Sequence, residues 1–230
     1  MQDPTPNLLQ LRVGKPKNMA ASCPPGEEGL LHRPGGAWRS AIFKMPVEGV
    51  VQLSSLGLAG DGVADKHHHG GPDQAVLAYA SEHYALWQAW GLNADVGAFG
   101  ENFLLEGLTD QEACIGDVFA MGRLGETVVQ ISHPRKPCAT LARRFQRNDV
   151  VSKVWETARG GWYMRVLREG RVQAGDGLTL RERPNPAWTV ARVMNAFHHA
   201  KENPEEALNA ADASGLTVRW ASSLREKAGA

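Results

Sequence analysis

The chain has 230 residues, of which 43% are hydrophobic and 22% charged, and its 25 basic side chains balance its 25 acidic ones. This composition is that of a globular protein with a core, and it argues against nucleic-acid binding, which usually needs a strongly basic domain or stripe. No apolar run approaches the roughly 20 residues of a membrane span, and the N-terminus lacks a secretory signal. Cys23, Cys114 and Cys138 include no close pair, so we expect reduced thiols and a cytoplasmic protein.

Short strand patterns dominate the first part of the chain. Alternating apolar residues predict a strand over residues 9–13, and the turn signal at 46–49 predicts a hairpin between residues 41–43 and 50–53. The polar, glycine-rich residues 60–73 predict a long loop. Further strands are expected at residues 75–79, 103–105, 118–121, 128–131, 162–167 and 178–180. So many short strands favour a barrel or a sandwich.

Helical patterns appear in two places. Ser81 is expected to cap a helix over residues 82–90, and shorter helices are expected after Cys138 and over residues 151–157. Beyond the proline-rich residues 183–186 the pattern is helical throughout, with predicted helices at 189–197, after Asn203-Pro204, and at 217–227. We therefore divide the chain into an N-terminal extension (1–8), a main β domain (9–183) and a three-helix C-terminal domain (184–230).

Cys138 is the first candidate functional residue. It lies between a predicted strand and a predicted helix, next to Arg135, Lys136 and two prolines. A helix N-terminus and neighbouring cations favour the thiolate form of a cysteine, which is the nucleophilic and metal-binding form. The alternative is a buried structural cysteine, because free cysteines are among the most buried residues.

The glycine-rich loop carries His67, His68 and His69. Imidazole is a common zinc ligand, but three consecutive side chains of an extended loop point in different directions and seldom bind one metal. We favour His69 as a hydrogen-bond donor, since Gly70 and Gly71 let a ligand approach the backbone. A zinc site is the alternative.

Two further groups could complete a ligand site. Asn102 follows Glu101 in a glycine-bounded turn, and its amide suits a heterocycle or a phosphate, although turn chemistry alone explains the pair. Lys15, Lys17 and Lys44 could form a cationic rim for an anionic ligand. Each of these lysines could equally be a solvated surface charge.

Several motifs together resemble the MOSC domain proteins of the YiiM-like family. The resemblance covers nearly the whole chain. Its motifs are Gly60-Asp61-Gly62 to Asp65, His69-Gly70-Gly71-Pro72-Asp73-Gln74-Ala75-Val76, Ser81-Glu82-His83-Tyr84, Phe99-Gly100-Glu101-Asn102, Gly107-Leu108, Ile115-Gly116-Asp117 and Pro134-Arg135-Lys136-Pro137-Cys138. Two features depart from the family pattern, namely the triple His in place of a single one and the N-terminal extension.

The resemblance implies a mainly β fold with helices: a closed or nearly closed β-barrel followed by a small three-helix domain. It also implies a pyranopterin molybdenum cofactor, with Cys138 as the protein's ligand to molybdenum and Arg135 facing the pterin or its phosphate. Lys15, Lys44, His69 and Asn102 are then expected to line the cofactor pocket.

The implied activity is a molybdenum-dependent reduction of N-hydroxylated small molecules of the hydroxylamino-purine type. A nearby acid, His69 or Glu101, could supply protons. The chain has no Rossmann or flavin motif, so we expect a separate flavoprotein reductase as electron donor, no nucleic-acid partner, and an oligomeric state that the sequence leaves open. The alternatives are a non-catalytic carrier of the cofactor or of activated sulfur that uses Cys138, and a zinc hydrolase.

Overall fold

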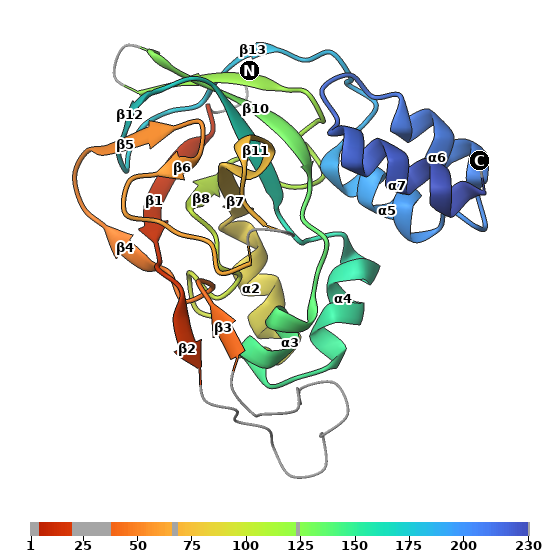
Figure 1. The fold of residues 1–230 in the computed structure, drawn as a ribbon, viewed down its shortest axis with the longest axis horizontal. Coiled ribbons are helices and arrows are strands. Elements are labelled where there is room, and N and C mark those ends of the chain that lie inside the picture. The colour runs from red at the N-terminus through yellow and green to blue at the C-terminus, as the bar shows by residue number, and fades with distance from the viewer. Residues whose placement is uncertain (1–4, 20–37, 66–68, 123–124, 230) are drawn as a thin grey trace.

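The structure is a computed structural model that describes residues 5–19, 38–65, 69–122 and 125–229. Its main feature is an eight-stranded sheet that curls into a barrel, with helices below it and a helical unit at one side (Figure 1). In spatial order the strands are β13 (Thr179–Glu182), β9 (Val118–Met121), β10 (Thr127–Pro134), β11 (Trp162–Arg168), β7 (Val76–Ala80), β8 (Phe103–Glu106), β1 (Asn7–Val13) and β4 (Met45–Val47). The predicted fold class is confirmed.

Neighbouring strands of this sheet are antiparallel except β7 and β8, which are parallel. Backbone hydrogen bonds also connect the start of β1 to the segment before β13. Leu8 N donates to Asp176 O (2.9 Å), Gly175 N to Leu8 O and Leu178 N to Pro6 O (both 2.7 Å). These bonds form a seam between the first strand and the end of the β domain, so the sheet is nearly closed.

The hairpin predicted between residues 41–43 and 50–53 is wrong. In the structure β4 (Met45–Val47) pairs with β1, whereas β5 (Val51–Ser54) joins β6 (Gly57–Leu58) and β12 (Gly170–Val172) in a separate three-stranded sheet. Residues 41–43 form no strand, because Ile42 packs into a hydrophobic cluster below the sheet. A two-stranded sheet of β2 (Lys17–Met19) and β3 (Trp38–Ser40) lies beside it.

Three helices cover one face of the sheet: α2 (Glu82–Ala89), α3 (Ala139–Phe145) and α4 (Asp149–Thr157). Their apolar side chains pack with Tyr79 and Leu104 of the sheet in a cluster that includes Trp87, Leu141 and Val154. Ser81 does not cap α2 as predicted, because its hydroxyl donates to Glu82 Oε2 (3.3 Å) and its backbone is already helical. A single 3-10 turn, η1 (Pro72–Gln74), precedes β7.

The C-terminal unit contains the three predicted helices: α5 (Val190–His198), α6 (Pro204–Ala211) and α7 (Val218–Ala228). The residue immediately before each helix caps it with a side-chain hydrogen bond. Thr189 Oγ1 accepts from Arg192 N, Asn203 Oδ1 from Glu206 N and Thr217 Oγ1 from Trp220 N. In Figure 1 these helices stand at the side of the sheet, and their apolar faces join the same hydrophobic core as the barrel interior.

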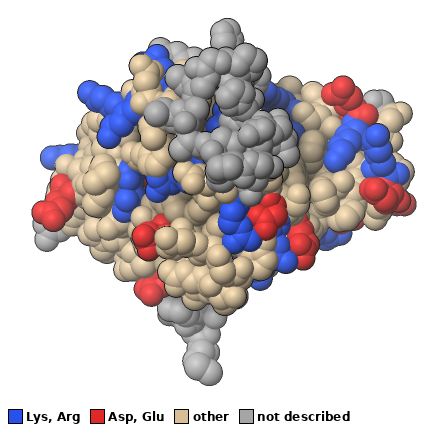
Figure 2. All heavy atoms as spheres, turned by 90° about the horizontal axis from the view of Figure 1, so that it is seen from below, with Lys and Arg blue, Asp and Glu red and all other residues tan. Residues whose placement is uncertain are grey.

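On the face of the molecule seen from below, Lys and Arg side chains are interspersed with Asp and Glu (Figure 2). This mixture agrees with the equal numbers of acidic and basic residues in the sequence. Among the described residues, none of the helices has the length and apolar character required to span a bilayer.

Candidate functional site

A pocket of about 380 Å³ lies where the loop before η1 meets the segment between β10 and α3. Its size is within the range of small-molecule and cofactor sites. Five of the six predicted site residues line it, together with Asp61: they are Lys44, His69, Asn102, Arg135 and Cys138. Side chains from distant parts of the sequence therefore converge on one cavity.

Cys138 occupies the residue before α3, with an extended backbone (φ −137°, ψ 169°). Its carbonyl accepts a hydrogen bond from Leu141 N (2.9 Å), which starts the helix. The residue lines the pocket, it is half-buried, and its thiol forms no disulfide. The thiol is therefore accessible from the pocket. Cys114 is the other free cysteine of the described residues and is fully buried, while Cys23 lies outside them.

Arg135 is only 6% exposed and also lines the pocket. Its backbone N–H donates to Gly161 O (2.9 Å), which ties this segment to the start of β11. The guanidinium Nη1 is buried and has no hydrogen-bond partner among the described residues. A buried donor without an acceptor is costly, so this nitrogen indicates an anionic or polar ligand in the pocket.

Asp61 organises the opposite wall. Its carboxylate accepts from Lys44 Nζ (2.5 and 2.7 Å), from Gly14 N (2.7 Å) and from Asn102 Nδ2 (2.8 Å). Burial lowers the pKa of Lys44, whereas the neighbouring Asp61 opposes this change. The Lys44 charge is thus balanced by Asp61, and the lysine keeps one further N–H for a ligand.

The side chain of Asn102 is used by the protein itself. Oδ1 accepts from Leu77 N (3.1 Å), and Nδ2 donates to Arg12 O (3.1 Å) as well as to Asp61. Asn102 therefore joins β1, β7 and the Asp61 loop at the pocket wall. Its neighbour Glu101 does not line the pocket, because it is fully buried and accepts from Tyr84 Oη (2.5 Å) and Gly97 N (2.7 Å) instead.

His69 lies at the pocket, followed by Gly70 and Gly71, whose φ angles of 82° and 85° favour glycine. Its backbone N–H donates to Asp65 O (3.0 Å). His67 and His68 lie outside the described residues. Over the ranges that the structure describes, there is no group of three His, Cys, Asp or Glu side chains that could hold a metal ion.

Lys15 is exposed and is not among the residues that line the pocket. It follows Gly14, whose N–H binds Asp61, so its backbone lies close to the pocket wall. Its contribution to a cationic rim stays a prediction.

The pocket residues that the sequence reasoning did not assign to the site include Gln74, Arg143 and Tyr163. Burial raises the pKa of Tyr163, Arg135 lowers it and Cys138 raises it, because both neighbours lie close to the phenol. The only available signal for Tyr163 was its place in an apolar strand pattern, which indicates core packing. Asp61 belongs to the Gly60-Asp61-Gly62 motif, but nothing in the sequence connects it to Lys44.

Comparisons with known proteins agree with this arrangement. Residues 65–179 match the MOSC domain. The uncharacterized protein YflK of Bacillus subtilis is 36% identical over 222 residues, which cover 96% of this chain and 94% of that protein. A protein of Gibberella moniliformis named "Reductase" is 37% identical over 201 residues, and the matched segment covers 84% of this chain but only 33% of that protein.

Among solved structures, the crystal structure of YiiM from Geobacillus stearothermophilus superimposes with a TM-score of 0.75 at 29% identity and covers 97% of this chain and 99% of that one. The similarity therefore includes the C-terminal helices as well as the barrel. The chain belongs to the MOSC domain family, as a YiiM-like member.

Proposed function

We propose that this protein is a molybdenum-cofactor-dependent reductase of N-hydroxylated small molecules, of the hydroxylamino-purine type. Membership of the MOSC family, a domain associated with the molybdenum cofactor, and similarity to a protein named "Reductase" support an oxidoreductase in general. The specific observation behind the proposal is the buried guanidinium nitrogen of Arg135, which has no hydrogen-bond partner among the described residues and lies in the same pocket as the half-buried Cys138.

The donor set of the pocket suits a pyranopterin cofactor. A soft thiolate at Cys138 matches a molybdenum centre, and the buried Arg135 nitrogen, unpaired within the described part of the chain, matches the phosphate or a polar edge of the pterin. Arg143 lines the same pocket and has a buried Nε without a partner among the described residues. Two cationic side chains with unused donors favour a ligand that carries negative charge.

Each pocket residue then has a distinct role. Cys138 would hold the metal, and Arg135 would fix the anionic part of the cofactor. Lys44 would donate to the ligand from the opposite wall, with Asp61 and Asn102 holding it in place. His69, on the glycine-rich loop, would hold the proton that the reduction needs.

Reduction of an N-hydroxylated amine breaks the N–O bond, consumes two electrons and two protons, and releases the amine and water. When bound, the cofactor supplies the electron pair. The chain contributes a proton at His69, whose imidazole is the pocket group best suited to general acid catalysis near neutral pH. Because the sequence carries no flavin or Rossmann motif, we propose that a separate flavoprotein reductase renews the electrons.

The test is metal and activity analysis of protein purified from a host that makes the cofactor. Wild type should contain molybdenum and reduce a hydroxylamino-purine with an artificial electron donor. Cys138→Ala should lose both properties, whereas Cys114→Ala, a change at the buried cysteine outside the pocket, should keep them. Full molybdenum content and activity in Cys138→Ala would refute the assignment.

Arg135 gives an independent check that does not depend on turnover. Arg135→Met should lower the bound molybdenum and pterin, Arg135→Lys should retain more of both, and Arg171→Met, at an exposed arginine, should match wild type. If the loaded protein holds cofactor or a labile sulfur on Cys138 but shows no reductase activity, a carrier function replaces the reductase proposal.

A further inference from the structure

His133 is a buried imidazole for which the proposed chemistry has no use. It lies in β10, two residues before Arg135, and is only 4% exposed. Its ring packs between those of Tyr163 (centroids 5.1 Å apart) and Trp220 (6.2 Å). Burial, together with the nearby cations Arg165, Lys136 and Arg219, lowers its pKa to about 3. At neutral pH the imidazole is therefore uncharged.

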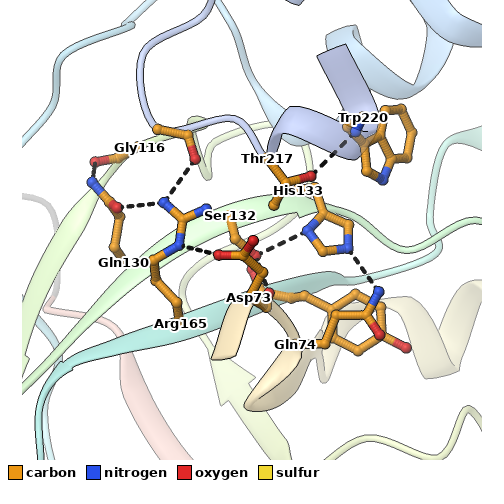
Figure 3. Close-up of polar contacts among 11 residues, drawn as sticks. Asp73, Gln74, Gly116, Gln130, Ser132, His133, Arg165, Thr217 and Trp220 are labelled. Carbon is orange, nitrogen blue, oxygen red and sulfur yellow. Dashed lines mark hydrogen bonds and ion pairs between the residues drawn. The ribbon is translucent and has the colours of Figure 1, made fainter. Parts of the chain in front are cut away.

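The hydrogen bonds around His133 define which nitrogen carries the proton (Figure 3). Gln74 Oε1 accepts from Gly70 N (2.9 Å), so the amide nitrogen of Gln74 is the atom that faces His133 Nε2 (3.2 Å). An amide nitrogen only donates, so Nε2 accepts and the proton is on Nδ1. Nδ1–H then donates to Ser132 Oγ (3.0 Å).

Ser132 completes a ring of contacts that returns to η1. Having accepted from His133, its hydroxyl is free to donate to Asp73 O (2.7 Å) or Tyr163 O (3.0 Å). When the hydroxyl donates to Asp73 O, the three hydrogen bonds all run in the same donor-to-acceptor direction, from Gln74 to His133, from His133 to Ser132 and from Ser132 to Asp73. Because Gln74 and Asp73 are consecutive residues, β10 holds η1 at two points.

The same turn is held from the side of the C-terminal helices. Arg165 Nε binds Asp73 Oδ1 (2.7 Å), while Arg165 Nη1 donates to Gln130 Oε1 (2.8 Å) and Gly215 O (2.9 Å). Figure 3 shows Asp73 and Gln74 on one side of β10 and Trp220 and Thr217 on the other, with Ser132 and His133 between them. The pocket loop is thus connected through β10 to the start of α7.

We propose that Gln74 and His133 are positioning residues that hold the His69–Gly71 segment against the pocket, with His133 acting as a neutral Nδ1–H imidazole. This inference rests on the proposed function only for its effect on catalysis. Gln74 itself lines the pocket, and through Gly70 it fixes the backbone that carries His69. A small shift of a reacting group lowers the rate more than it lowers binding, so the predicted effect is on kcat.

Three variants separate the hydrogen bond from the packing. His133→Phe keeps a ring between Tyr163 and Trp220 but removes both nitrogens. Gln74→Glu keeps the acceptor for Gly70 N and replaces the donor that faces His133 with a carboxylate oxygen. His133→Gln offers an amide oxygen as acceptor for Gln74 and is the conservative rescue. Gln52→Glu, at an exposed glutamine of β5, is the control.

With rates normalised to bound molybdenum, His133→Phe and Gln74→Glu should lower kcat about tenfold with KM changed less than about twofold, and His133→Gln should recover most of the loss. Wild-type kcat in both variants would overturn the proposal. A matching loss in His133→Gln, or a loss explained wholly by a lower fraction of folded protein, would also overturn it.

Two readouts need no activity and so remain valid if the protein is not a reductase. Nitrogen-15 NMR of imidazole-labelled protein should show the His133 proton on Nδ1 at pH 7. Hydrogen–deuterium exchange of the segment that contains Gly70 should be faster in His133→Phe than in wild type and unchanged in Gln52→Glu. A proton on Nε2, or unchanged exchange in His133→Phe, would contradict the inference even if the reductase activity is confirmed.

Discussion

Replacing Asp61 by asparagine removes the negative charge that faces the buried ammonium of Lys44. The side chains of Lys44 and Asp61 are 8% and 13% exposed, and their closest approach is 2.5 Å. The new amide would still accept one hydrogen bond, but its NH2 group would face a donor. The variant therefore leaves a buried charge without its partner.

Breaking a buried ion pair in this way costs about 3–5 kcal/mol of unfolding free energy. The lower end applies here, because Lys44 can relieve the cost by losing its proton. We expect urea titrations at pH 7 to give Asp61→Asn an unfolding free energy about 3 kcal/mol lower than that of wild type. Glu156→Gln, in the exposed pair with Lys153 (2.8 Å), is the matched control and should change the stability by less than about 1 kcal/mol.

The stability deficit of Asp61→Asn should change with pH in a direction that can be measured. The pKa of Lys44 is already below its ordinary value of 10.5, and loss of Asp61 lowers it further. Between the folded-state pKa and 10.5 the unfolded chain binds more protons than the folded one, so stability rises with pH in that window. The deficit of Asp61→Asn should therefore shrink between pH 7 and pH 10. A deficit below about 1 kcal/mol at pH 7, or one that grows with pH, would refute this account.

Three further predictions concern other parts of the molecule. Because the pKa of His133 is about 3 against an ordinary 6.5, wild type should lose on the order of 4 kcal/mol more stability than His133→Phe between pH 7 and pH 3.5 in denaturant titrations; parallel curves would contradict this. Thr217→Ala removes the cap of α7 and should cost about 1 kcal/mol in thermal unfolding, whereas Ser81→Ala, where no side-chain cap forms, should cost less than about 0.5 kcal/mol. In Gly160→Ala the added Cβ would lie 2.7 Å from Arg135 O, so calorimetry should show an unfolding free energy about 1–3 kcal/mol lower than that of wild type. Unchanged stability would contradict this, because it would mean that the backbone shifts without cost.

The features that sequence reasoning predicted well depend on local chemistry. Thr189, Asn203 and Thr217 were predicted to begin helices and do so, because a cap needs only its own side chain and the next few backbone N–H groups. Cys138 and Arg135 were predicted to lie together for the same reason, since they are three residues apart in one segment, and both line the pocket. Neighbours in the chain suffice for such features.

The features that were missed depend on contacts between distant segments. The hairpin at residues 41–53 failed because β4 pairs with β1, and an alternating pattern does not say which strand is the partner. Likewise Asp61 joins Lys44 to Asn102 only after three separate segments have folded together. Asn102 was expected to offer its amide to a ligand, yet the protein uses both ends of that amide, which no local pattern could indicate.

The seam that joins residues 6–8 to residues 175–178 bears on the order in which the protein assembles during synthesis. Among the partners of β1, β4 follows soon after it in the chain, whereas β8 and the segment before β13 follow much later. Until these later segments are made, the part of the β1 edge that they cover stays unpaired, and an unpaired strand edge invites association with other chains. The seam can form only once residue 178 has been made, so until then the barrel stays open along this line.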